Sequence, residues 1–264
     1  MSAVGVIGGS GLYALLEDAQ QVTIETPFGA PSAPVTLGEV AGRRVAFLPR
    51  HGVDHELPPH RIPYRANLWA LRACGVRQVL APCAVGSLRA ELGPGSLVVP
   101  DQLVDRTSGR AQTVHETGAV HLSFDEPYCP AGRAVVLDRA SAAGWEPTDG
   151  GTMVVVEGPR FSTRAESVWF AAQGWSLVNM TGHPEAVLAR ELALCYTSIA
   201  LVTDLDAGVN GEDAVSQEQV FRVFAENTVR LRALVMDVIE ALPAERSCRC
   251  GNALDGIDHD LVLP

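Results

Sequence analysis

Residues 176–207 read SLVNMTGHPEAVLARELALCYTSIALVTDLDA, and this stretch decides the fold. A short apolar run at 177–178 leads into a polar corner at 179–183, and a helical segment opens at Pro184. A second apolar run, 196–202, ends on the acidic sequence TDLD. This order predicts two strands joined by a helix, with polar residues gathered at the carboxyl ends of both strands. Ligands bind at that edge in open α/β sheets.

The rest of the chain repeats this alternation of strands and helices. The small residues at 82–87, after the strand at 78–81, would let the backbone approach a ligand, and the polar segment 107–120 predicts a mobile loop. With no linker or internal repeat, the pattern favours one α/β domain over residues 1–264 whose sheet is covered on both faces. The remaining predicted strands are 4–7, 22–24, 43–48, 97–100 and 152–156, and the remaining predicted helices are 12–16, 64–71 and 216–242.

Composition narrows the classes of partner. Hydrophobic residues make up 47% of the 264 residues and charged residues 19%, which is enough for a globular core and argues against disorder. A net charge of −11 argues against nucleic acid, whose phosphates require clustered cations. A small anionic substrate still fits if a few cations and helix N-termini are focused locally. The chain shows neither a signal peptide nor an apolar run of membrane length, so a cytoplasmic location is expected.

The six cysteines are expected to be reduced thiols in a chain without an export signal. Cys248 and Cys250, with His259 downstream, raise the possibility of zinc. Paired cysteines in structural zinc sites are usually separated by two or more residues, whereas a single residue lies between these two. The spacing therefore favours a regulatory or incidental thiol pair, and no metal is expected.

Three motifs each allow a functional and a plainer interpretation. The glycine turn GGSG at 8–11 could bind an anion or begin a dinucleotide site, although Glu25 arrives too early for a ribose-binding carboxylate; it could also be an ordinary tight turn. Arg50 and His51 could clamp a phosphate or form a polar turn. Phe161, just past a strand, could stack on a planar ligand or pack in the core.

Six short motifs occur together in an order and at distances typical of one family. They are GGSGL at 8–12, PRHG at 49–52, YRAN at 64–67, EGPRF at 157–161, NMT at 179–181 and TDLD at 203–206. From residue 5 to its final Leu-Pro, the chain resembles the methylthioadenosine phosphorylases within the trimeric purine nucleoside phosphorylase family. The resemblance implies a central mixed β-sheet flanked by helices, orthophosphate as co-substrate, a homotrimer, and neither metal nor cofactor.

The resemblance also implies roles for individual residues. Asp204 would be the catalytic residue, assisting the leaving purine at N7, and its pairing with Ser162 indicates a 6-aminopurine; relatives that prefer 6-oxopurines carry Asn and Glu there. The phosphate site would comprise Ser10, Arg50, His51, Cys83, Ala84 and Thr181. The nucleoside site would comprise Phe161, Ser162, Met180, Asp204 and Asp206.

The pocket for the 5′ group departs from the family pattern. Gln217 and His183 stand where apolar residues are usual, and Cys83 replaces a hydroxyl residue in the phosphate site. Val220 and Phe221 would keep one side of the 5′ pocket apolar. A neighbouring subunit would contribute His121 and Val262, with residues 245–264 forming a tail that packs at the subunit interface.

We therefore expect phosphate-dependent cleavage of an adenine nucleoside, with 5′-methylthioadenosine as the substrate and adenine and 5-methylthioribose 1-phosphate as products. Adenosine or another 5′-substituted purine nucleoside is the alternative substrate. From other classes, the alternatives are a dinucleotide-binding oxidoreductase, based on the glycine turn, and a non-catalytic nucleoside-binding protein.

Overall fold

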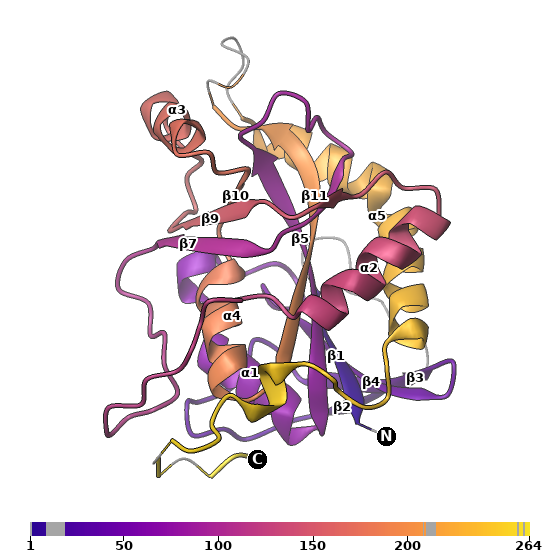
Figure 1. The fold of residues 1–264 in the computed structure, drawn as a ribbon, viewed down its shortest axis with the longest axis vertical. Coiled ribbons are helices and arrows are strands. Elements are labelled where there is room, and N and C mark those ends of the chain that lie inside the picture. The colour runs from indigo at the N-terminus through magenta and orange to yellow at the C-terminus, as the bar shows by residue number, and fades with distance from the viewer. Residues whose placement is uncertain (1, 9–18, 208, 210–214, 258, 261) are drawn as a thin grey trace.

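A computed structural model of the chain shows one α/β domain built on a mixed β-sheet (Figure 1). The described residues are 2–8, 19–207, 209, 215–257, 259–260 and 262–264. Within them the sheet has 11 strands, with helices on both faces. The strands are β1 Ala3–Gly8, β2 Gln20–Val22, β3 Val35–Val40, β4 Arg43–Pro49, β5 Val76–Ser87, β6 Leu97–Val99, β7 Gln102–Arg106, β8 Thr148–Asp149, β9 Thr152–Val156, β10 Leu177–Asn179 and β11 Cys195–Leu205.

The helices that cover this sheet fall into two pairs. In Figure 1, α1 and α4 lie on one side of the sheet, and α2 and α5 lie on the other. One buried apolar cluster joins α1 and α4 to the sheet, and a second joins α2 and α5 to the sheet. The helices are α1 Tyr64–Ala73, α2 Pro130–Ala142, α3 Arg164–Ala172, α4 Gly182–Glu191 and α5 Gln217–Ala241, with short 3-10 helices η1 Pro59–Arg61 and η2 Arg249–Asn252.

Strand β5 is the hub of the sheet. The main strand order is β2-β3-β4-β1-β5-β10-β9-β7, and β11, β6 and β8 branch from β5. Along one side β5 pairs in parallel with β11, from Gln78 opposite Cys195 to Ser87 opposite Leu205. Along the other side it pairs first with β1 and, at its carboxyl end, with β10. Since β10 runs antiparallel to β5, with Val178 opposite Gly86, the short strand β10 lies beside the last residue pairs of the β5–β11 ladder.

The strand predicted at 78–81 is longer in the structure. The small residues at 82–87 continue β5, because ladder pairing with β11 holds them extended. Residues 107–120 have no regular structure, as predicted, but Arg110 ties this segment to the core. Its guanidinium donates to the carbonyl oxygens of Met180 at 2.9 Å, His183 at 2.7 Å and Glu157 at 2.7 Å.

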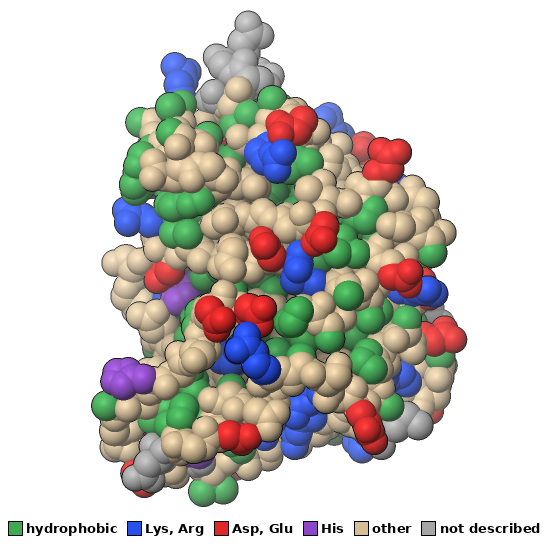
Figure 2. Space-filling model, viewed as in Figure 1, with side chains coloured by type: hydrophobic (Ala, Val, Ile, Leu, Met, Phe, Trp, Pro, Cys, Tyr) green, Lys and Arg blue, Asp and Glu red, His purple; other side chains and the backbone are tan. Residues whose placement is uncertain are grey.

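The opening prediction of strand, helix and strand is confirmed by β10, α4 and β11. His183 has an extended backbone within α4, with φ −113° and ψ 132°, so regular helix begins at Pro184 as expected. Among the helices of the described ranges, none is both long and apolar enough to cross a lipid bilayer. On the face seen in Figure 2, basic side chains are scattered among acidic ones.

Candidate active site

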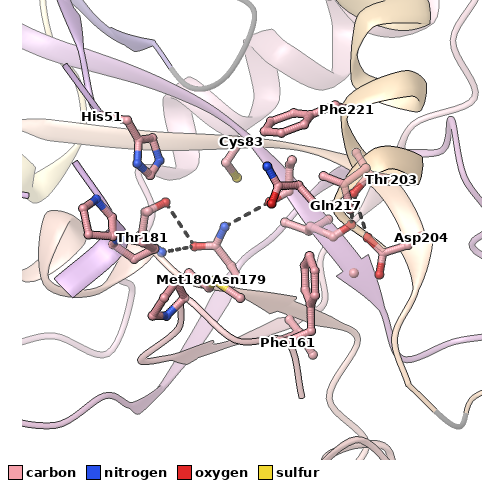
Figure 3. A pocket seen from close by; sticks show the side chains of 18 of the residues that line it. His51, Cys83, Phe161, Asn179, Met180, Thr181, Thr203, Asp204, Gln217 and Phe221 are labelled. Carbon is pink, nitrogen blue, oxygen red and sulfur yellow. Dashed lines mark hydrogen bonds between the residues drawn. The ribbon is translucent and has the colours of Figure 1, made fainter. Parts of the chain in front are cut away.

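A cavity of about 390 Å³ lies where β10 adjoins the carboxyl-terminal parts of β5 and β11. The loop after β4 and the first turn of α5 line its other walls. Figure 3 shows His51 and Thr181 on one side of this cavity and Asp204 and Phe161 on the other. The cavity therefore has two chemically different ends, which we call the cationic end and the acidic end. Its predicted site residues are Arg50, His51, Cys83, Ala84, Phe161, Ser162, Met180, Thr181, Asp204, Asp206, Gln217, Val220 and Phe221.

Arg50 is fixed at the cationic end by a buried ion pair. Its Nε lies 2.6 Å and its Nη2 3.1 Å from the two carboxylate oxygens of Glu185 in α4. Burial works against the guanidinium charge, but the Glu185 carboxylate outweighs it and raises the pKa of Arg50. Nη1 also donates to the Pro82 carbonyl oxygen at 3.3 Å. These contacts use three of the five guanidinium N–H groups and hold the others in a fixed orientation beside the cavity.

Glu185 is itself held in place from the sheet. The Tyr196 hydroxyl donates to its Oε2 at 2.7 Å, and both side chains are buried. A carboxylate that accepts from a guanidinium fork and a hydroxyl is well satisfied in the interior. Tyr196 and Glu185 thus orient Arg50 without lining the cavity.

His51 is neutral in this environment. Its Nδ1 lies 2.8 Å from the Leu57 carbonyl oxygen, which can only accept, so Nδ1 carries the proton. Burial, opposed by this hydrogen bond and aided by the charge of Arg50, lowers the pKa of His51 to about 4. The other ring nitrogen, Nε2, is then an acceptor. A protonated phosphate oxygen is a suitable donor to it.

Asn179 shapes the turn that carries Met180 and Thr181. Its Oδ1 accepts from the backbone N–H of Thr181 at 2.8 Å and of Gly182 at 2.6 Å, and its Nδ2 donates to the Ala84 carbonyl oxygen at 3.2 Å. The first backbone donors of α4 are therefore already used. The Thr181 hydroxyl also donates to Asn179 Oδ1, at 3.4 Å, which leaves its oxygen as an acceptor for a protonated ligand atom (Figure 3).

Asp204 dominates the acidic end. The register of β11 on β5 shifts between Val202 and Asp204, and such bulges re-aim side chains next to functional sites. The Thr203 hydroxyl donates to Asp204 Oδ2 at 2.8 Å. Burial raises the pKa of Asp204 to about 6; the Thr203 hydrogen bond opposes this and the negative charge of Asp206 adds to it. A carboxyl group with such a pKa can exchange a proton near neutral pH.

Gly86 leaves room for the Asp204 carboxylate because it has no side chain. The two residues face each other across the β5–β11 ladder. A Cβ added at Gly86 would lie 3.0 Å from Asp204 Oδ1 and 3.4 Å from the Cβ of Asp206. A side chain at this position would press on both carboxylates.

Asp206 and Ser162 lie together at the acidic end, where both line the cavity. Burial raises the pKa of Asp206, and hydrogen bonds from the hydroxyl groups of Ser162 and Ser167 oppose this rise. Ser162 therefore helps to hold the Asp206 carboxylate in place beside the cavity.

The side of the cavity beneath α5 is mixed in polarity. Ser216 caps α5 by accepting from the Gln219 N–H at 3.2 Å, which places Gln217 in the first helical turn. Gln217, Val220 and Phe221 all line the cavity, as their shared helix face predicted. Phe221 remains 40% exposed in the single chain.

Comparison with known proteins places this constellation in a family. Residues 3–240 match the family model described as the phosphorylase superfamily. The chain belongs to this superfamily. It is 61% identical to the "Purine nucleoside phosphorylase" of Streptomyces coelicolor over 99% of this chain and 97% of that protein. It is 56% identical to the "S-methyl-5'-thioadenosine phosphorylase" of Mycolicibacterium smegmatis over 99% of both chains.

Solved structures agree with this membership of the phosphorylase superfamily. A methylthioadenosine phosphorylase from an antarctic soil metagenomic library superposes with a TM-score of 0.89 at 39% identity, covering 96% of this chain and 90% of that one. A mutant of the adenosine/methylthioadenosine phosphorylase from Schistosoma mansoni, in complex with methylthioadenosine, gives a TM-score of 0.88 at 35% identity over 93% of both chains. The predicted family, mixed-sheet fold and phosphorylase activity are confirmed, and the oxidoreductase alternative was wrong.

Three predicted site residues of this superfamily member do not line the cavity in the single chain. A fourth, Ser10 in the glycine turn, falls outside the described residues. His183 is buried away from the cavity lining, with its Nε2 3.3 Å from an Asp105 carboxylate oxygen. His121 is exposed and Val262 is 83% exposed, and neither lines the cavity in the single chain.

Other residues were missed by sequence reasoning. Asn179 was quoted within a motif but given no role, although it shapes the turn between the two ends of the cavity. Glu185 and Tyr196 lie outside the cavity, and only tertiary packing brings them to Arg50. Arg110 supports Met180 from a loop that carried no recognisable signal. A buried charge such as that of Arg50 requires a counter-charge, and this requirement was the one clue to an acidic partner.

Proposed function

We propose that the protein catalyses phosphorolysis of 5′-methylthioadenosine, yielding adenine and 5-methylthioribose 1-phosphate. The observation that carries this proposal is the acidic end of the cavity, where Asp204 and Asp206 are buried with raised pKa values beside Phe161. A carboxylate accepts from the 6-amino group of adenine, and a protonated carboxyl donates to a ring nitrogen. The aromatic ring of Phe161 offers a face for the purine.

The cationic end suits orthophosphate. Arg50 supplies a permanent positive charge in a fixed orientation, and the Thr181 hydroxyl and Cys83 lie on the same side. Burial raises the pKa of the Cys83 thiol, so this side chain stays neutral and adds no negative charge against the anion. Orthophosphate is thus proposed as co-substrate, with no cofactor in the reaction.

The proposed reaction balances in protons. A phosphate oxygen forms a bond to C1′ as the bond from C1′ to the purine nitrogen breaks. The purine gains a proton at N7 from Asp204, and the phosphate hydroxyl, which donates a hydrogen bond to neutral His51 Nε2, gives up its proton to water as the bond to C1′ forms. Positive charge that develops on the ribose is stabilised by the adjacent anionic phosphate.

A second candidate substrate, adenosine, is favoured by Gln217. Its amide offers a donor and an acceptor to a 5′-hydroxyl group, whereas a methylthio group pairs with neither. The Streptomyces coelicolor relative, named a purine nucleoside phosphorylase, is consistent with this alternative. Val220 and Phe221 favour the methylthio group, because they present apolar surface to the same cavity.

A homotrimer is part of the proposal. Exposed His121 and Val262 and the half-open 5′ side of the cavity support contributions from a neighbouring subunit, with tail residues 245–264 at the interface. Light scattering would measure the assembly.

The cytoplasmic location expected from the sequence stays a prediction.

The substrate assignment is tested by measuring base release from methylthioadenosine, adenosine and inosine with and without phosphate. We expect kcat/KM to be highest for methylthioadenosine and lowest for inosine. Preference for inosine would contradict the role of the two carboxylates, and preference for adenosine would favour the second candidate.

A further inference from the structure

Four of the six cysteines meet at one point on the opposite side of the fold from the cavity. All four Sγ atoms lie within 4.8 Å of one another. They come from three segments that are far apart in the sequence. We call this group the cysteine cluster; it consists of Cys129, Cys195, Cys248 and Cys250.

Each segment enters the cysteine cluster at the end of an element. Cys129 caps the N-terminus of α2, and Cys195 is the first residue of β11. Cys248 precedes η2 with an extended backbone, φ −89° and ψ 164°, and Cys250 lies inside η2. This bend brings two thiols to the same side although only one residue separates them. The single residue between Cys248 and Cys250 therefore does not exclude zinc, contrary to the expectation from sequence, and His259 is not needed.

We propose that the cysteine cluster binds one structural zinc ion through four thiolates. Four sulfur ligands at about 2.3 Å from a tetrahedral zinc ion lie about 3.8 Å from one another. The observed upper limit of 4.8 Å and the 3.3 Å between the Sγ atoms of Cys195 and Cys248 bracket this value. A closed set of four sulfur ligands is the donor set of structural zinc sites.

The surroundings suit a zinc site. Cys129, Cys195 and Cys250 are each no more than 3% exposed, which restricts access of water and competing ligands. The Gly132 N–H donates to Cys129 Sγ at 3.5 Å, a contact of the kind that orients and stabilises a metal-bound thiolate.

A positive charge beside two of the segments that carry the cysteine cluster offsets part of the net negative charge of a zinc ion with four thiolates. The Arg246 guanidinium packs against Gly251, where an added Cβ would lie 2.8 Å from Nη2. The same side chain donates to the Ala193 carbonyl oxygen at 2.7 Å, two residues before β11. Arg246 thus lies between the segment after α5 and the start of β11, beside two of the three segments that supply ligands.

The position of the site indicates a structural role. Cys195 and Asp204 stand at opposite ends of β11, nine residues apart, which corresponds to about 30 Å of extended strand. A zinc ion there cannot reach the reacting atoms. It would instead connect the segment after α5 to the start of α2 and to the start of β11. Apart from the zinc ion, packing contacts hold these three segments together.

The zinc content of the purified full-length protein tests the proposal directly. We expect about one zinc ion per chain after extensive dialysis, measured by inductively coupled plasma mass spectrometry. The double variant Cys248→Ser/Cys250→Ser should lose the metal, with a Tm lower by on the order of 5–10 °C. Cys74→Ser is the matched control, because Cys74 lies outside the cysteine cluster, and it should keep the metal.

A thiol titration of the wild-type protein makes the test independent of whether the double variant folds. In denaturant with a chelator and without reductant, a zinc site releases all six thiols. Absence of zinc with only two reactive thiols would show that the four cysteines form two disulfides. Absence of zinc with six thiols would show a metal-free cluster. Either result, or zinc retained by the double variant, would overturn the proposal.

Discussion

Replacing Asp204 with Asn should make the protein more stable and, at the same time, much less active. The pKa of Asp204 rises from 3.8 to about 6 in the folded protein, mainly because the carboxylate loses its hydration on burial. A difference of about 2 pKa units corresponds to about 3 kcal/mol of unfolding free energy lost when the group is ionised. Asn keeps the shape of the side chain and accepts from Thr203 without carrying a charge.

The sign of this effect fixes its pH dependence. Because the folded pKa lies above the unfolded value of 3.8, the destabilisation is absent below pH 3.8. It grows as pH rises and is complete above about pH 6. The stability advantage of Asp204→Asn should therefore be about 1.6 kcal/mol at pH 5 and about 3 kcal/mol at pH 7.5. The larger value corresponds to a Tm increase of roughly 6–10 °C.

Differential scanning calorimetry at both pH values, alongside steady-state kinetics, measures the two effects. We expect kcat/KM for methylthioadenosine to fall by on the order of 10²-fold or more, the range of acid–base assistance. Asp138→Asn is the control; this carboxylate is 67% exposed on α2 and its replacement should change stability by less than about 0.5 kcal/mol. A Tm difference that does not grow with pH would refute the account of Asp204 burial, and unchanged kinetics would refute its catalytic role.

Three further substitutions probe other walls of the cavity. Arg50→Ala should raise KM for phosphate much more than KM for nucleoside in a grid of initial rates. It should also lower the free energy of unfolding by about 3–5 kcal/mol, because Glu185 is left buried without its partner. An equal rise in both KM values would assign Arg50 a purely structural role. Gly86→Ala should lower kcat/KM by about tenfold by pressing on the catalytic carboxylate, whereas Gly93→Ala, where nothing lies within 4 Å of the added Cβ, should not. Gln217→Val should raise the ratio of kcat/KM for methylthioadenosine to kcat/KM for adenosine by roughly tenfold, because it removes an amide that a methylthio group leaves unpaired. A constant ratio would show that Gln217 does not face the 5′ group.

The acidic end of the cavity was predictable from the sequence. An apolar run that stops abruptly on TDLD places Asp204 at the end of a buried strand, and the structure ends β11 at Leu205. Phe161 was open to two interpretations from sequence, and it lines the cavity. Local patterning suffices for such residues, because their position follows from the element they terminate.

Contacts between distant segments were not predictable. Arg50 and Glu185 are 135 residues apart, and the sequence around neither residue indicates its partner. The cysteine cluster requires α2, β11 and η2 to meet, whereas the sequence offered only the adjacent pair Cys248 and Cys250. The strand predicted at 78–81 continues through residues 82–87, because pairing with β11 keeps these small residues extended. In each case tertiary context overrides the local signal.

The central claim is that the cavity joins phosphate to the sugar while releasing adenine. Phosphorus-31 NMR of the purified protein with methylthioadenosine and orthophosphate tests it most directly. The account predicts a new sugar 1-phosphate signal that grows in step with adenine, and no adenine release when phosphate is omitted. Adenine release without phosphate, with free methylthioribose as the product, would show hydrolysis instead and would contradict the account.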